Sequence, residues 1–272
     1  MTGQIQMTTI TFIFFYLAMF ANAVVFSALG QGGGVLYTPI QLMFGIDFHI
    51  AAATTLFLVM VTSLSSTLVF HKAKVVDWGM AVALESTTTL GGFLGGLYSG
   101  HFSGRALTYL FAGVIAFAAF FMVRTFAPPE HSGKRRFYEW RRSMGRETYQ
   151  INLALALPIS FVAGAISGLI GVAGGILKVP MMVLLFGVPM NIAVGSSAFM
   201  VGLTATGGFG GHLAAGHVNW PITLALVPGI FIAGQIGARR AVKVDKHRMK
   251  VFFGWFLFAL SAFLVARTMW TG

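Results

Sequence analysis

Long apolar runs separated by short polar or glycine-rich stretches make up most of the chain. An α-helix needs about 20 predominantly apolar residues to cross a bilayer, and most of the runs have that length. Segments 35–45 and 174–187 are too short to cross comfortably, and each follows a cluster of glycines. The predicted segments are 10–29, 35–45, 50–71, 78–99 and 105–125, then 150–170, 174–187, 192–214, 220–241 and 249–270. The pattern predicts an all-α integral membrane protein, and it leaves open whether the two short segments cross or re-enter.

One long hydrophilic stretch, 126–149, interrupts this pattern. It separates residues 1–125, predicted as a first transmembrane repeat, from residues 150–272, predicted as a second one. Basic residues concentrate on the cytoplasmic side of membrane proteins, so the stretch is predicted to be a basic cytoplasmic linker. Its basic residues are Lys134, Arg135, Arg136, Arg141, Arg142 and Arg146.

The two halves resemble each other, and each contains five hydrophobic segments. Residues 30–39, GQGGGVLYTP, align with residues 171–180, GVAGGILKVP. The two threonines at 54–55 likewise align with the two serines at 196–197. An internal duplication of this kind is typical of secondary transporters.

Loop charges indicate that the second copy is inverted relative to the first. Loop 72–77 carries two lysines, whereas its counterpart 215–219 carries neither Lys nor Arg. Loop 100–105 carries only Arg105, whereas its counterpart at 239–250 carries six basic residues. Because the basic side swaps between the copies, each half is predicted to cross the membrane an odd number of times. Arg105 is the exception to this topology.

Composition narrows the function classes. Hydrophobic residues make up 57% of the chain and charged residues 9%, with a mean hydropathy of +0.82. Soluble domains carry about 25% charged residues, so a soluble enzyme and a nucleic-acid-binding protein are excluded. The net charge of +11 is therefore a topology signal. The chain has no cysteine, which excludes Cys-ligated metals, and no cofactor or metal site is predicted.

The two glycine clusters are the main candidates for a functional site. A helix interrupted within the membrane exposes polar backbone groups, which is tolerated only where the break is buried or lines a wet cavity. The helix that follows each break presents a partly positive N-terminus with free N–H donors, which favours an anion. Two such breaks in inverted copies are expected to converge near the midplane, although structural hairpin turns without a ligand are the alternative. The predicted donors are Gly32, Gly33, Gly34, Gly174 and Gly175, and Pro39 and Pro180 are predicted to help end or kink the short helices.

Lys178 and Glu85 are the only charged residues well inside apolar segments. Each costs about 2.5–3.5 kcal/mol or more at the centre of the bilayer, so a function is expected for both. Lys178 is predicted to neutralise a bound anion. Glu85 is predicted to carry a coupled proton. The alternatives are an ion pair between the two residues, a Lys178 that extends to the interface, and a Glu85 that contacts neighbouring hydroxyls.

Hydroxyl side chains at matching positions extend the candidate site. Thr55, Ser196 and Ser197 are predicted to contact substrate oxygens or a cation, and helix capping or bonding to the preceding turn is the alternative. A weak similarity to intramembrane serine proteases at 165–168 gives Ser167 as nucleophile, with His212 or His217 as base.

The glycine elements resemble a known family. SALGQGGGVLYTP at 27–39 and SGLIGVAGGILKVP at 167–180 are similar to the duplicated signature of the TauE/SafE (sulfite exporter) permeases, as are AVGSSA at 193–198 and GHVNW at 216–220. The resemblance covers nearly the whole chain. It implies a secondary transporter of the bacterial cytoplasmic membrane for sulfite, sulfonates, sulfoacetate or related anions. Gln31 distinguishes the first element from the second and is a candidate substrate contact.

The predicted function is a proton-coupled permease for a small sulfur-containing anion, working by alternating access around the glycine breaks. Its expected partners are the anion and membrane lipid, and not nucleic acid; a homodimer is compatible with the sequence. The alternatives are a cation or metal permease, a passive anion channel and, with the weakest support, the serine protease.

Overall fold

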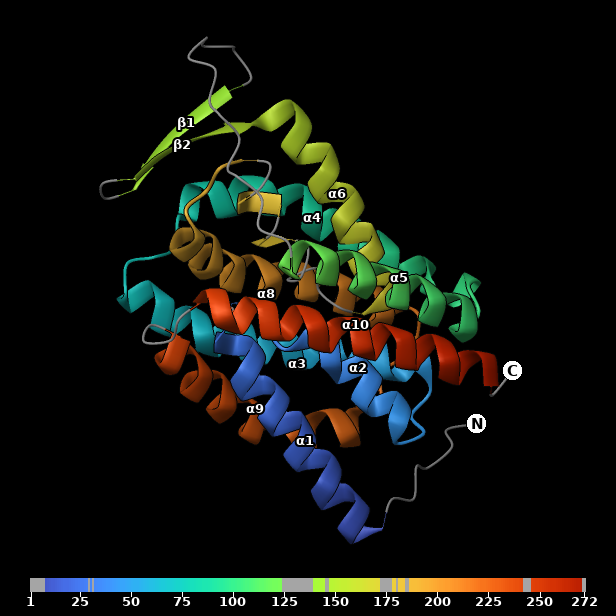
Figure 1. The fold of residues 1–272 in the computed structure, drawn as a ribbon. Helices are drawn as coiled ribbons and strands as arrows, with labels where there is room; N and C mark the ends of the chain where they lie inside the picture. The colour runs from blue at the N-terminus through green and yellow to red at the C-terminus, as the bar shows by residue number, and fades with distance from the viewer. Residues whose placement is uncertain are drawn as a thin grey trace.

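The computed structural model describes residues 8–28, 30, 32–123, 139–144, 147–171, 178–179, 181–183, 186–241 and 246–270. The first half contains α1 (Thr9–Ala28), α2 (Gly34–Met43), α3 (Phe48–Lys72), α4 (Trp78–Tyr98), the short 3-10 helix η1 (Ser99–His101) and α5 (Gly104–Val123). A hairpin of β1 (Glu139–Met144) and β2 (Glu147–Asn152) follows, and the second half contains α6 (Leu153–Ile170), α8 (Met190–Ala214), α9 (Trp220–Ala241) and α10 (Lys246–Trp270) (Figure 1).

Helices dominate the structure, which confirms the all-α membrane class. Within the described part of the chain, five helices are long and apolar enough to cross a membrane. Large apolar side chains point outward, as with Phe14 at 64% exposed and Val162 at 56%. Hydroxyl groups are instead buried, because lipid offers them no hydrogen-bond partner. The five helices are Thr9–Ala28, Phe48–Lys72, Leu153–Ile170, Met190–Ala214 and Trp220–Arg240.

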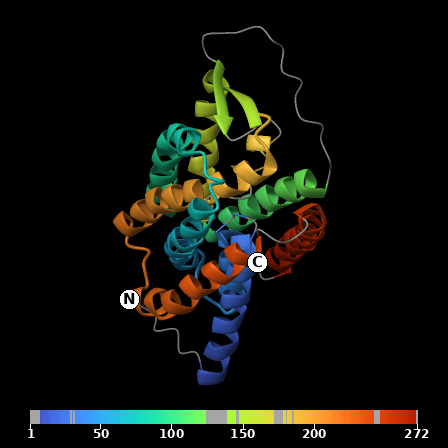
Figure 2. The same cartoon turned by 90° about the vertical axis from the view of Figure 1, so that its left-hand side faces the viewer.

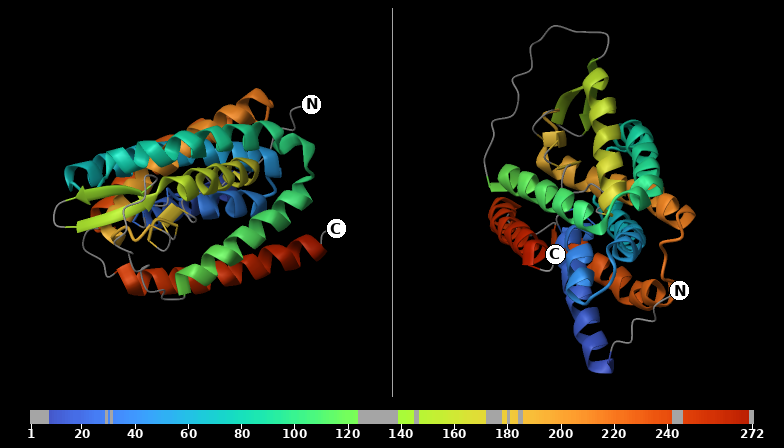
Figure 3. Two further views of the ribbon diagram at one scale, coloured as in Figure 1. Left: turned by 90° about the horizontal axis from the view of Figure 1, so that it is seen from above. Right: turned by 90° about the vertical axis from the view of Figure 1, so that its right-hand side faces the viewer.

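Helix packing follows the internal repeat. Helices α3 and α8 are both 25 residues long, hold corresponding positions in the two halves and pack against each other. Helix α4 packs on α6 and α8, and its counterpart α9 packs on α1 and α3. Helices α5 and α10 lie side by side at one edge (Figure 3). Exchanging the halves maps this pattern onto itself, as a two-fold relation between the repeats would. The opposite orientation of the halves in the membrane stays a prediction.

Glycines allow the helix backbones of α4, α6 and α8 to touch. A β-carbon at Gly164 or Gly168 of α6 would overlap a backbone carbonyl of α4. A β-carbon at Gly211 of α8 would likewise overlap the carbonyl of Phe93. Small residues are the usual means of close helix approach in membranes, so glycine is required where these three helices cross.

The hairpin β1–β2 is an element that the sequence analysis did not predict. The sequence predicts a hydrophilic linker over 126–149 and a helical segment from residue 150, whereas α6 begins at Leu153. Residues 126–138 and 145–146 of that linker lie outside the described residues. The strands pair antiparallel, with Arg142 opposite Tyr149, and the hairpin lies at one end of the helical body (Figure 2). Tyr149 and Ile151 are buried, so one face of the hairpin belongs to the core.

Candidate functional site

The first glycine break joins α1 to α2. Gly30, Gly32 and Gly33 all adopt positive φ angles, of 69°, 66° and 80°, which favour glycine over residues with a β-carbon. Gly33 is the N-cap of α2, and no side chain in the described part of the chain caps this helix end. The carbonyl of Gly33 accepts a hydrogen bond from Asn22 Nδ2 at 2.8 Å. The first turn of α2, which begins at Gly34, therefore keeps backbone donors for another acceptor.

Each break rests on the long helix of the other half. A β-carbon at Gly30 would overlap the carbonyl oxygen of Val194 on α8. Gly171 ends α6 with a φ of 72°, and a β-carbon there would overlap Ala52 on α3. Val194 and Ala52 hold corresponding positions in the two halves. Gly30 of the first break thus packs on α8, and Gly171, the described start of the second break, packs on α3. The convergence of the two breaks on one substrate site stays a prediction.

The predicted hydroxyl residues all have partners within the protein. Ser197 Oγ donates to the carbonyl of Gly30 at 3.0 Å, which places Ser197 at the first break. Thr55 Oγ1 accepts from Thr38 Oγ1 at 3.0 Å and from Gln41 Nε2 at 2.8 Å, so it fixes α2 on α3. Ser196 Oγ accepts the backbone N–H of residue 77 at 2.9 Å.

Four of the predicted site residues lie outside the part of the chain that the structure describes. These are Gln31, Gly174, Gly175 and Pro180. Pro39 lies inside α2, which continues to Met43, so Pro39 does not end this helix. The alternative, that Pro39 kinks the helix, stays a prediction.

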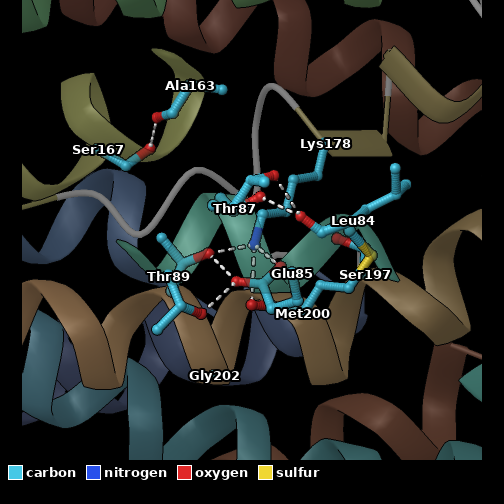
Figure 4. A network of polar contacts seen from close by, with 12 residues as sticks. Leu84, Glu85, Thr87, Thr89, Ala163, Ser167, Lys178, Ser197, Met200 and Gly202 are labelled. Carbon is cyan, nitrogen blue, oxygen red and sulfur yellow. Dashed lines mark hydrogen bonds and ion pairs between the residues drawn. The ribbon is translucent and has the colours of Figure 1, made fainter. Parts of the chain in front are cut away.

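Lys178 and Glu85 form an ion pair of 2.7 Å inside the protein (Figure 4). Both side chains are 1% exposed. The Lys178 ammonium also donates to the carbonyl of Met200 at 2.8 Å and to Thr204 Oγ1. Thr204 and, at 3.3 Å, Thr89 donate to Glu85 Oε1. All three ammonium protons are therefore used, and the structure shows the ion pair that the sequence analysis gave as an alternative.

The first half holds a neutral version of the same contact. Tyr37 occupies the position of Lys178 in the repeat, and its hydroxyl lies 3.1 Å from Thr62 Oγ1. Thr62, which corresponds to Thr204, donates to the carbonyl of Leu58 at 2.8 Å. Thr62 and Thr204 are not among the residues predicted from the sequence. Their matching positions in the two repeats could have identified them as part of the site. Of the two corresponding residues Tyr37 and Lys178, only Lys178 carries a charge.

Asp77, the N-cap of α4, connects the hairpin to this centre. Its carboxylate accepts from Arg142 Nε at 3.1 Å, from Tyr149 and from the backbone N–H of Met80 at 3.1 Å. Its own backbone N–H donates to Ser196. Burial acts to raise the pKa of Asp77, but the hydrogen bonds from Arg142 and Tyr149 outweigh it, so the pKa lies below its ordinary value.

The residues of the predicted serine protease do not assemble. Ser167 Oγ donates to the carbonyl of Ala163 at 2.6 Å. His212 Nε2 donates to the carbonyl of Gly168 at 3.0 Å, so its Nδ1 accepts from His217 Nδ1, also at 3.0 Å. The serine and the histidines thus have other partners, and this arrangement does not activate Ser167 as a nucleophile.

Comparisons with known proteins agree with this geometry. The family model for the sulfite exporter TauE/SafE matches residues 14–264, which includes both halves. The probable membrane transporter protein YunE of Bacillus subtilis is 32% identical over 223 residues, covering 78% of this chain and 82% of that protein. A probable membrane transporter protein of Xylella fastidiosa is 29% identical over 250 residues, covering 88% and 89%. No solved structure gives a significant match. The chain is therefore a multi-pass membrane transporter that belongs to the sulfite exporter TauE/SafE family.

Proposed function

We propose that the chain moves a small sulfur-containing anion, such as sulfite, a sulfonate or a sulfoacetate-like compound, across the bacterial cytoplasmic membrane. One observation carries this proposal: Gly30 of the first break packs on α8 at Val194, and Gly171 at the start of the second break packs on α3 at the corresponding residue Ala52. Broken helices at the interface between repeats are where secondary transporters bind their substrates. The family description adds the sulfur chemistry.

The charge of the site favours an anion. The start of α2 carries a partial positive charge and lacks a side-chain cap, so Gly33 and Gly34 offer backbone donors. Lys178, from the short segment after the second break, holds a full positive charge against the carbonyl of Met200 on α8. Val201, the next residue of α8, packs against Gly32 of the first break. An anion bound between the start of α2 and Lys178 would interact with both.

The ion pair supplies a way to couple transport to protons. With Glu85 ionised, Lys178 is fully occupied by protein acceptors. A proton on Glu85 would remove the negative partner, and the anion would take its place beside Lys178. Substrate and proton would then move together through the alternating-access cycle.

A thermal-shift panel on the purified protein tests the substrate class. Sulfite, sulfoacetate, taurine, an aryl sulfonate, thiosulfate and sulfate are compared, with chloride and divalent cations as controls. A ligand at about 100 times its Kd should stabilise the fold by about 2.7 kcal/mol. A shift with a sulfur oxyanion supports the proposal. Shifts with divalent cations alone would contradict it and favour the metal permease.

A further inference from the structure

A pocket with a volume of about 340 Å³ lies between α3 and α8. Its walls come from corresponding positions of the two repeats, including Phe57 with Phe199 and Leu64 with Thr206. The pocket therefore lies at the boundary between the repeats, where the glycine breaks also rest. Its volume falls at the lower end of the range of about 300–1,000 Å³ for small-molecule sites.

Two buried hydroxyl oxygens in this pocket, Ser63 Oγ and Thr67 Oγ1, have no hydrogen-bond partner among the described residues. They lie one turn apart on α3. Hydroxyls on membrane helices usually bond to a carbonyl of the preceding turn, as Ser66 and Thr206 do here at 3.2 and 2.9 Å. An unpaired hydroxyl among apolar groups costs free energy, so these two donors indicate a ligand that accepts hydrogen bonds.

Ser63 also borders the first glycine break. A β-carbon at Gly32 would lie 2.9 Å from Ser63 Oγ, and one at Gly202 would lie 2.9 Å from Ser63 Cβ. Gly202 lines the pocket. Ser63 therefore lies between the backbone donors of the break on one side and the apolar pocket on the other.

We infer that the α3–α8 pocket receives the apolar body of an organic anion whose charged group binds at the first break, with Ser63 donating a hydrogen bond to that group. This inference rests on the proposed function and narrows its substrate to an organosulfonate with an aliphatic or aromatic body. A lipid acyl chain in the pocket would leave both hydroxyls unpaired. An anion that combines oxygens with an apolar body satisfies the hydroxyls and fills the volume.

Binding of an alkanesulfonate series to the protein in lipid nanodiscs tests this assignment. From methanesulfonate to hexanesulfonate, affinity should rise about fourfold for each methylene that enters the pocket. Leu64, at the rim, is 61% exposed, so Leu64→Trp should fill the pocket without disturbing the core and should abolish the dependence on chain length. Leu68→Trp is the matched control, because Leu68 is 48% exposed, lies one turn further and does not line the pocket.

The Ser63→Ala variant separates a ligand role from a structural one. Because Ser63 Oγ has no partner, its removal should leave the ligand-free protein as stable as wild type or more stable. Sulfonate affinity should nevertheless fall about tenfold, as for a lost hydrogen bond to a charged group. Ser66→Ala is the control, since Ser66 bonds within its own helix.

Each remaining outcome has a definite meaning. Sulfite binding with no gain along the series, or a Leu64→Trp variant that behaves as wild type, overturns the pocket assignment and leaves the proposed function intact. If Leu64→Trp changes how binding depends on the acyl-chain length of the nanodisc lipid, but not on the chain length of the sulfonate, the pocket is a lipid site. That result also overturns the pocket assignment. Absence of binding by every sulfur anion refutes both proposals.

Discussion

At the scale of single residues, the buried pair of Lys178 and Glu85 is the main electrostatic feature between α4 and α8. Its members come from α4 and from the short segment after the second break. Neither charge has access to water, and the surrounding acceptors and donors are Met200, Thr204 and Thr89. Such a pair tolerates the loss of both charges better than the loss of one.

A double-mutant cycle tests this directly. Lys178→Met and Glu85→Gln should each destabilise the protein, the first by about 3–5 kcal/mol because it strands an ionised carboxylate. The combined variant should recover much of that loss, which unfolding in detergent would measure. If the combined variant is stable but no longer binds the anion, the pair serves transport. Additive losses in the cycle would show that the two residues are not coupled.

At the scale of elements, the glycine breaks and the hairpin determine how the halves meet. The lengths and apolar patterns of α3 and α8 were predictable from the sequence, because long runs of about 20 apolar residues specify membrane helices. The hairpin was not predictable, since Tyr149 and Ile151 belong to an apolar pattern that continues into α6. The ion pair of Lys178 with Glu85 was predictable only as an alternative, because the sequence shows two isolated charges in different halves and not their contact.

The first break is tested by Gly30→Ala with Gly45→Ala as its control. Both glycines have positive φ, so both substitutions carry a backbone strain of about 1–2 kcal/mol. Only at Gly30 would the new methyl group meet a neighbour, the carbonyl of Val194. Gly30→Ala should therefore destabilise the protein more than Gly45→Ala does and should weaken anion binding. Equal losses of stability in a thermal unfolding assay would contradict the contact with α8.

The hairpin contact predicts a pH-dependent stability. The pKa of Asp77 is lowered in the folded protein, so the ionised carboxylate stabilises the fold. This stabilisation is complete above about pH 4 and is lost as the pH falls through the lower pKa of the folded state. Asp77→Asn should destabilise the protein at neutral pH, and its difference from wild type should shrink in acid. Arg142→Ala should behave similarly, whereas Arg141→Ala, on the exposed side of the strand, should not. A difference that stays constant with pH would rule out the carboxylate.

At the scale of the whole molecule, a symmetric frame carries an asymmetric site. The helix pairs, the glycine breaks and the contacts of Tyr37 and Lys178 with their threonines repeat in both halves. The charges do not, since Val227 holds the position of Glu85 in the second half. A repeated frame suits a transporter whose two states exchange the roles of the halves. In the proposed cycle, the pair of Lys178 and Glu85 would supply the charge selectivity and carry the proton.

The most direct test of this account is accumulation of labelled sulfite or a sulfonate in proteoliposomes under an imposed pH gradient. The account predicts accumulation above the equilibrium level, in the direction that the proton gradient drives, and its loss when a protonophore is added. Flux that only equilibrates the anion, whatever the pH gradient, would identify a passive channel and contradict secondary transport.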